Sequence, residues 1–172
     1  MNIITVLIAV LPAAVVAVTA YYLLKKLLDN YQRNQVISLK AEHQKSITPV
    51  RLQAFERLML LLERISPSSL VFRVDKQDFS ASQYQSKLLE NIRSEFEHNL
   101  SQQIYISSDA WKYVVHAKEE VIKLINSAAM DLPEGSNASD LARKIFEMTA
   151  EVGLEPVEQA RQFLKREVRE YF

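Results

Sequence analysis

The sequence contains no cysteine and only two glycines among its 172 residues. The missing cysteine excludes a cysteine nucleophile, and it does not indicate any one cellular compartment. Gly135 and Gly153 stand alone, so the chain has no glycine-rich loop of the kind that cradles phosphate groups. So little glycine also permits few of the tight turns that β-rich folds require. The composition is therefore typical of a helical protein.

Charge of either sign is missing from residues 1–24, and Lys25 and Lys26 follow at once. The apolar run over residues 3–24 would extend about 33 Å as a helix, enough to cross a hydrocarbon core of about 30 Å. Tyr21 and Tyr22 end the run, where amphipathic rings favour the headgroup region. Pro12 is no obstacle, because helices in lipid tolerate proline. The pattern predicts a transmembrane anchor over residues 1–24.

A cleaved signal peptide is the alternative explanation of this run. The triplet Val18-Thr19-Ala20 has the small residues of a cleavage site. A signal peptide, however, carries positive charge before its apolar region, and that region usually spans about 7–15 residues. Neither property is found here, so the uncleaved anchor is the preferred interpretation.

The charge that follows the anchor predicts its orientation. Residues 25–48 hold five Lys or Arg against two acidic side chains, and 5 − 2 gives +3. Positive flanks stay on the cytoplasmic side of a membrane. We therefore expect the N-terminus outside and the C-terminal part in the cytoplasm, with residues 25–48 as a stalk or linker. A solvated helical spacer is favoured over a coiled coil, which needs several sustained heptads.

Residues 49–172 have the length of one domain. All the charged residues lie after the anchor, 21 of each sign, and no basic stripe is visible. This balance gives no reason to expect nucleic acid as a partner. The predicted fold is all-α: an N-terminal transmembrane helix and a stalk, followed by a cytoplasmic bundle of about five helices.

Caps and apolar periodicity place the five helices of the bundle. The first follows Thr48 as N-cap, with Pro49 at the first helical position. The second begins at a Ser80–Gln83 capping box, and Ser107 or Ser108 caps the third. Ser139 or Asp140 caps the fourth, which Gly153 stops. The predicted ranges are 49–65, 80–105, 108–130, 140–152 and 156–171, and residues 66–74 form a packed connector.

Apolar side chains recur at helical spacing along each range, and each set predicts a buried face. The sets are Leu52, Phe55, Leu58, Met59, Leu62 and Ile65; Tyr84, Leu88, Leu89, Ile92, Phe96, Leu100 and Ile104; Trp111, Val114, Val115, Ile122, Ile125 and Ala129; Leu141, Ile145, Met148 and Val152; and Val157, Ala160, Leu164, Val168 and Tyr171. Leu60 and Leu61 fall outside the first set. They either extend the core or form a surface that meets another chain.

Glu95-x-x-His98 is a candidate metal-binding motif, because Glu-x-x-His pairs bind metals in ferritin-like bundles. Such a site needs two copies of the motif, and the other candidate, His116-x-x-Glu119, runs in the reverse order. Helical geometry also turns His98 and His116 away from the apolar faces. No metal, no cofactor and no catalytic motif are therefore predicted, and an enzyme is not the expected function.

Four strings carry a resemblance: YYLLKKLL at residues 21–28, RLQAFERL at 51–58, LERISP at 62–67 and EFEHNLSQQIY at 95–105. The chain resembles an uncharacterised bacterial family of single-pass, membrane-anchored helical proteins, over most of its length. The resemblance implies a bacterial inner-membrane protein and attaches no activity to it.

The candidate interaction residues are Arg57, Leu61, Arg64, Glu95 and His98. Arg57 and Arg64 are seven residues apart on the first predicted helix of the bundle. Glu95 and His98 belong to a polar stretch of the second predicted helix. These arginines either pair with neighbouring helices, or they recognise another protein, since arginine is favoured at interfaces.

The expected function is a membrane-tethered helical protein–protein interaction or scaffold module, whose partner is an unidentified protein or a second copy of the chain. The alternative is a small accessory subunit of an inner-membrane complex, whose anchor packs against other transmembrane helices. Ala13, Ala14, Ala17 and Ala20 would permit such close packing.

Overall fold

The computed structural model of the chain describes the backbone of residues 3–76, 78–152 and 155–171. Side chains are described for residues 16–17, 19–28, 31, 47–76, 78–151 and 156–171. This part of the chain consists of helices and loops, with one isolated β-bridge between Ser80 and Asn137. The predicted all-α fold class is therefore confirmed for the described residues.

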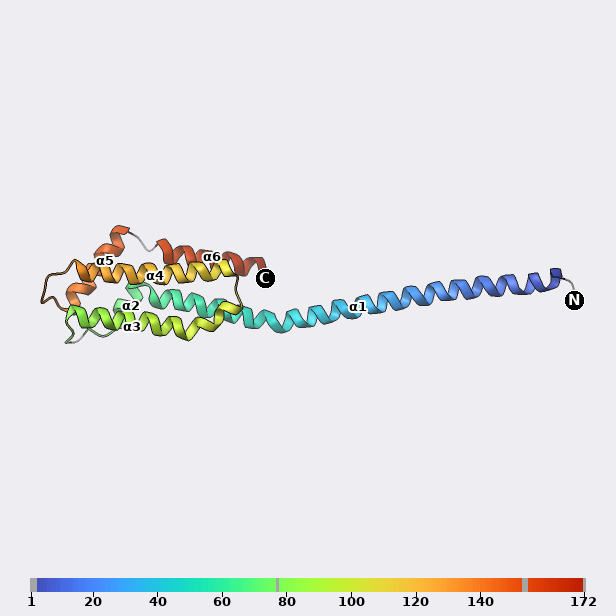
Figure 1. The fold of residues 1–172 in the computed structure, drawn as a ribbon, viewed down its shortest axis with the longest axis horizontal. Coiled ribbons are helices and arrows are strands. Elements are labelled where there is room, and N and C mark those ends of the chain that lie inside the picture. The colour runs from blue at the N-terminus through green and yellow to red at the C-terminus, as the bar shows by residue number, and fades with distance from the viewer. Residues whose placement is uncertain (1–2, 77, 153–154, 172) are drawn as a thin grey trace. The chain divides into compact units, whose positions relative to one another are not determined.

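The helices follow one another with short connections, as the colours of Figure 1 trace. In chain order they are α1 (Ile3–Ile65), α2 (Pro67–Arg73), α3 (Ala81–Asn99), the 3₁₀ helix η1 (Leu100–Ile104), α4 (Ser108–Met130), α5 (Ala138–Val152) and α6 (Glu155–Tyr171). Contacts divide the chain into two units, Met1–Thr48 and Pro49–Phe172.

Within the described part of the chain, no helix has a stretch long and apolar enough to cross a lipid bilayer. The predicted anchor, residues 1–24, lies mostly outside that part, because the side chains of residues 1–15 and 18 are not among those described. Gly153, the predicted stop of the fourth helix, also lies outside the described residues.

The helix α1 runs through Pro49 without a break, so the predicted helix start at Thr48 is wrong. A proline inside a helix removes one hydrogen bond and can bend the helix, but it does not have to end it. Residues 25–48, predicted as a helical stalk, are part of this same helix.

The second unit is built on the last turns of α1. Phe55, Leu58, Leu62 and Ile65 are buried there, as their spacing predicts. Leu52 was expected on the same face and is instead half exposed. Leu60 and Leu61, the two leucines outside the main face, differ in burial. Leu61 is 1% exposed and belongs to the core, whereas Leu60 is 52% exposed.

Residues 67–73, expected as part of a non-helical connector, form the short helix α2. Pro67 occupies the first turn, where its fixed φ suits a helix and its missing N–H costs nothing. Leu70 and Val71 are fully buried, and α2 packs on α5. The buried side chains of Leu70 and Val71 hold this turn against the core.

The predicted caps of α3 and α4 are confirmed. Ser80 N donates to Gln83 Oε1 at 3.0 Å, and Gln83 N donates to Ser80 Oγ at 3.3 Å, which is a complete capping box. Ser107 Oγ accepts from Ala110 N at 3.0 Å at the start of α4. The predicted N-cap of α5, Ser139 or Asp140, is wrong by two or three residues. Asn137 has this role, because its Oδ1 accepts hydrogen bonds from Ser139 N and Asp140 N.

The second predicted helix ends earlier than expected. After Asn99 the chain tightens into η1, which rotates Leu100 and Ile104 into solvent, the latter 72% exposed. Both had been expected on the buried face. A 3₁₀ helix has three residues per turn, so the apolar periodicity of α3 does not continue through it.

The buried face of α4 is rotated from the predicted one. It consists of Ala110, Val114, Ala117, Val121, Ile125 and Ala128. Trp111 and Ile122 are only partly buried at its edge. The small alanines allow α4 to pack closely against α3, α5 and α6, and Figure 1 shows α4 alongside α6. Lys118 Nζ lies 4.4 Å from the centre of the Phe96 ring, which is a cation–π contact.

Candidate functional site

A hollow of about 160 Å³ lies between the last turns of α1 and the end of α3. All five candidate interaction residues line it, although they come from two segments separated by some thirty residues. The lining consists of Arg57, Leu60, Leu61 and Arg64 from α1, and Glu95, His98 and Asn99 from α3. We refer to this feature as the α1–α3 hollow.

Helix geometry explains why these side chains meet. Arg57 and Arg64 are seven residues apart, which is about two turns, so they lie on the same side of α1, about 10.5 Å apart along its axis. Leu60 and Leu61 stand between them. Leu61 belongs to the core, so its candidate role as an exposed contact is corrected: it forms the apolar floor of the hollow.

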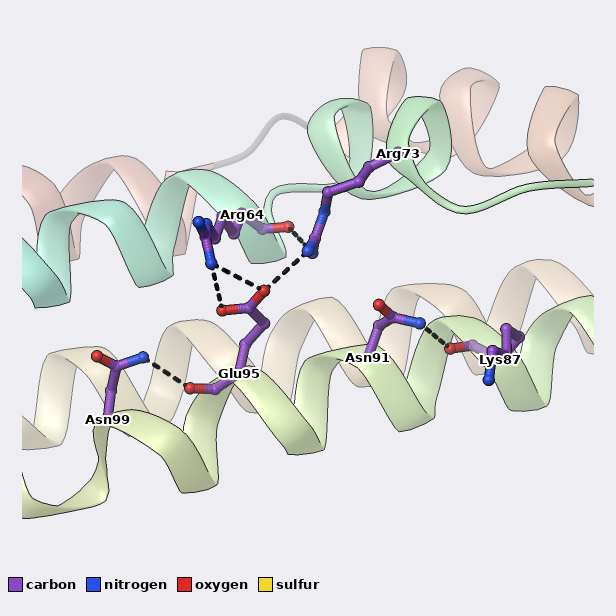
Figure 2. A network of polar contacts seen from close by, with 6 residues as sticks. All are labelled: Arg64, Arg73, Lys87, Asn91, Glu95 and Asn99. Carbon is purple, nitrogen blue, oxygen red and sulfur yellow. Dashed lines mark hydrogen bonds and ion pairs between the residues drawn. The ribbon is translucent and has the colours of Figure 1, made fainter.

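Glu95 is the centre of a polar network that Figure 2 shows. Arg64 Nη1 donates to both oxygens of this carboxylate, at 3.2 and 3.3 Å, and Arg73 Nη1 donates to Glu95 Oε1 at 2.8 Å. Arg73 Nη2 also donates to the backbone oxygen of Arg64 at 3.3 Å. The network therefore links α1, α2 and α3 through one carboxylate whose side chain is 14% exposed.

The two arginines of this network hold the carboxylate differently. The Arg64 side chain is 56% exposed and its contacts are long, whereas the Arg73 side chain is 38% exposed and its contact is short. Exposed ion pairs contribute only about 0–1 kcal/mol each, so the Arg64 contact is the weaker one. Of the two explanations for the arginines, internal pairing thus applies to Arg64.

Arg57 differs from Arg64. It is exposed, and it makes no hydrogen bond or ion pair with any residue that the structure describes. Exposed His98 likewise has no such bond within the described ranges. The lining of the hollow therefore holds two guanidinium groups, those of Arg57 and Arg64, against the one carboxylate of Glu95, a surplus of one positive charge. That surplus makes the hollow a place where an anionic group is attracted.

Asn99 closes the α3 side of the hollow. Its side chain is buried, and Nδ2 donates to the backbone oxygen of Glu95 at 2.8 Å, as Figure 2 shows. This bond ties the Asn99 side chain to the preceding turn of α3, at the point where the chain passes into η1. Asn99 and Arg73 were not among the predicted site residues, and no local pattern marks Arg73.

The sequence model of a family of unknown function, DUF7935, covers residues 1–171. The chain belongs to this family. No curated protein and no solved structure matches it.

The structure of this DUF7935 chain has a second, larger hollow of about 660 Å³ at the starts of α3 and α5. Ser80 and Asn137 line it, but both side chains are occupied as helix caps. The two loops are tied together there, since Ala81 N donates to Ser136 O and Ala138 N donates to Phe79 O. These caps and backbone bonds hold the starts of α3 and α5 together.

Among the described side chains, no further potential metal ligands lie beside Glu95 and His98. Across the described side chains, no three His, Asp or Glu residues lie close enough together to hold a metal ion. The Glu95 carboxylate is held by the two arginines, so its position reflects ion pairing.

Proposed function

We propose that this DUF7935 chain is a membrane-tethered protein–protein interaction module. Residues 1–24 act as the anchor, residues 25–48 as the stalk, and residues 49–172 as a helical domain that docks a partner at the α1–α3 hollow. The proposed location is a bacterial inner membrane, with the N-terminus outside and the helical domain in the cytoplasm.

The observation that carries the interaction role is the composition of the hollow. It combines an exposed leucine, Leu60, with an arginine that has no partner among the described residues, Arg57. Interfaces between proteins are enriched in arginine and in apolar contacts at their centre. The volume of about 160 Å³ suits an inserted side chain, because small-molecule pockets usually measure about 300–1,000 Å³.

The observation that supports the tether is the uncharged segment over residues 1–24, followed directly by Lys25 and Lys26. Such a segment is long enough for one bilayer crossing, and its positive flank favours a cytoplasmic domain.

In-cell photo-crosslinking tests the interaction role. A photoreactive amino acid replaces Leu60 in one chain and Glu119 in a control chain, Glu119 being an exposed residue of α4 outside the hollow. We expect a discrete adduct from position 60 and none from position 119. Equal labelling from both positions, or none from either, would contradict docking at the hollow.

Membrane fractionation tests the tether. The full chain should sediment with membranes and resist alkaline extraction, whereas a chain without residues 1–24 should be released. A reporter enzyme that is active only outside the cytoplasm, fused after Phe172, should be inactive, and Lys25→Gln with Lys26→Gln should weaken that bias. Activity of the reporter on the unaltered chain would overturn the orientation.

An accessory subunit of a membrane complex is the second candidate, favoured by Ala13, Ala14, Ala17 and Ala20 in the anchor. Under this alternative, crosslinks from the anchor should capture another membrane protein, and position 60 should give no adduct.

A further inference from the structure

We infer that the α1–α3 hollow recognises an acidic helix of a partner protein, whose carboxylates pair with Arg57 and Arg64 around an apolar side chain. This inference rests on the proposed interaction role and names the chemistry of the partner. It follows from three properties of the hollow: its surplus charge, its exchangeable ion pair and its spacing.

Surplus charge selects the sign of the partner. Glu95 is already shared by Arg64 and Arg73, so it does not neutralise Arg57. A guanidinium group forms two parallel hydrogen bonds with a carboxylate, and it does so at little desolvation cost compared with an ammonium group. Arg57 is therefore ready to receive a carboxylate without any internal bond being broken.

Arg64 can exchange its partner at small cost. Its contacts with Glu95 measure 3.2 and 3.3 Å, and its side chain is largely in solvent. If Arg64 turns towards an incoming carboxylate, Glu95 keeps the 2.8 Å bond with Arg73. The partly buried carboxylate of Glu95 then still has a cation beside it. Breaking an ion pair is costly mainly when it leaves a buried charge without a partner.

Spacing selects a helix. Arg57 and Arg64 are about 10.5 Å apart along α1, which equals seven residues of a second helix. Acidic residues at i and i+7 of a partner helix would face the two arginines. Apolar residues at i+3 and i+4 would then face Leu60 and the floor at Leu61, in the manner of a helix that lies in an apolar groove.

A synthetic peptide tests this chemistry directly. The probe is an alanine-rich helix of about 20 residues, long enough to be helical in isolation. It carries Glu at i and i+7, Leu at i+3 and i+4, and a fluorescent label. The control peptide replaces both Glu residues with Gln. Binding to the full chain in phosphatidylcholine nanodiscs is measured by fluorescence anisotropy.

We expect the Glu peptide to bind at least about tenfold more tightly than the Gln peptide. Arg57→Gln should weaken the Glu peptide by at least about tenfold, while Arg93→Gln, a matched loss of an exposed arginine on α3 outside the hollow, should leave its dissociation constant unchanged within about twofold. Arg57 makes no bond within the described residues, so its variant should fold as the original chain does.

Three results would overturn the inference. They are equal binding of both peptides, no binding of the Glu peptide up to about 1 mM, and equal losses for the Arg57 and Arg93 variants. A phosphoserine peptide that binds more than about tenfold better than the Glu peptide would replace the carboxylate with a phosphate as the ligand. Adduct formation at position 60 with failure of the Glu peptide would leave the interaction role intact and reject only the acidic helix.

Discussion

The hydroxyl of Tyr84 offers the sharpest test of how the bundle is held together. This side chain is fully buried, and its hydroxyl donates to the backbone oxygen of Val71 at 3.1 Å. Val71 lies near the end of α2, where carbonyls have no partner within the helix. Tyr84→Phe leaves that buried carbonyl unpaired, so the free energy of unfolding should fall by about 1–3 kcal/mol.

The same hydroxyl predicts a pH dependence with a definite sign. Burial raises the pKa of Tyr84 from 10.0 to about 12. Below pH 10 the hydroxyl is protonated in the folded and the unfolded chain, and its contribution to stability is complete. Between pH 10 and 12 the unfolded chain loses the proton first, so stability falls as the pH rises. The loss due to Tyr84 should reach about 1.4 kcal/mol by pH 11.

The assay is urea unfolding of the full chain, followed by the fluorescence of Trp111, the single tryptophan. Stability is compared between the original chain and Tyr84→Phe from pH 8 to pH 11. Tyr113→Phe is the matched control, because this partly buried ring stacks on Phe163 and its hydroxyl makes no hydrogen bond within the described residues. It should change the free energy of unfolding by less than about 0.5 kcal/mol.

The stability difference between the original chain and Tyr84→Phe should therefore narrow above pH 10. A difference that stays constant, or grows, would refute the assignment of the alkaline loss to this hydroxyl. Equal effects of Tyr84→Phe and Tyr113→Phe at neutral pH would refute the role of the bond with Val71.

Three further substitutions test other parts of the bundle, each by urea unfolding. Ser107→Ala removes both the cap of α4 and the hydrogen bond to buried Glu167, so it should cost more than the about 0.5–2 kcal/mol of a cap alone, whereas Ser108→Ala should stay within about 0.5 kcal/mol; equal effects would contradict both roles of Ser107. Trp111→Ala should cost about 1–3 kcal/mol, less than the 3–5 kcal/mol of a fully buried ring, because Trp111 lies at the edge of the core against Phe96; a larger loss would place it in the core. Gly135→Ala should lower the free energy of unfolding by about 1–2 kcal/mol. The φ of Gly135 is +85°, which is unfavourable for a residue with a side chain, and no atom lies within 4 Å of an added Cβ. An unchanged free energy of unfolding would contradict the left-handed backbone.

Local signals predicted most of the fold. The Ser80–Gln83 capping box is a pattern of four residues, and it formed where the sequence placed it. Elements whose outcome depends on distant packing were predicted less well. The separation of buried Leu61 from exposed Leu60 depends on which neighbours cover α1, and one step along a helix turns a side chain by about 100°.

The candidate site shows the same limit. The seven-residue spacing of Arg57 and Arg64 and the polar run of Glu95 and His98 were visible in the sequence, and all four line one hollow. That Arg64 would share Glu95 with Arg73, while Arg57 would not pair, was not predictable. It depends on α2, because Arg73 lies on that helix. Residues 66–74 had been predicted as a packed connector, so the position of Arg73 could not be foreseen.

One carboxylate of the last helix has a consequence for the order of assembly. Glu167 of α6 is buried, and it accepts hydrogen bonds from Ser107 N at 2.9 Å and Ser107 Oγ at 2.6 Å, across sixty residues. These two bonds, which hold the N-cap residue of α4, can form during synthesis only after α6 has been made. A nascent chain that stops short of α6 exposes the face of α4 that Ala160 and Leu164 help to cover. Such a chain carries an uncovered apolar surface, which is the feature by which chaperones and proteases distinguish interrupted translation products from finished ones.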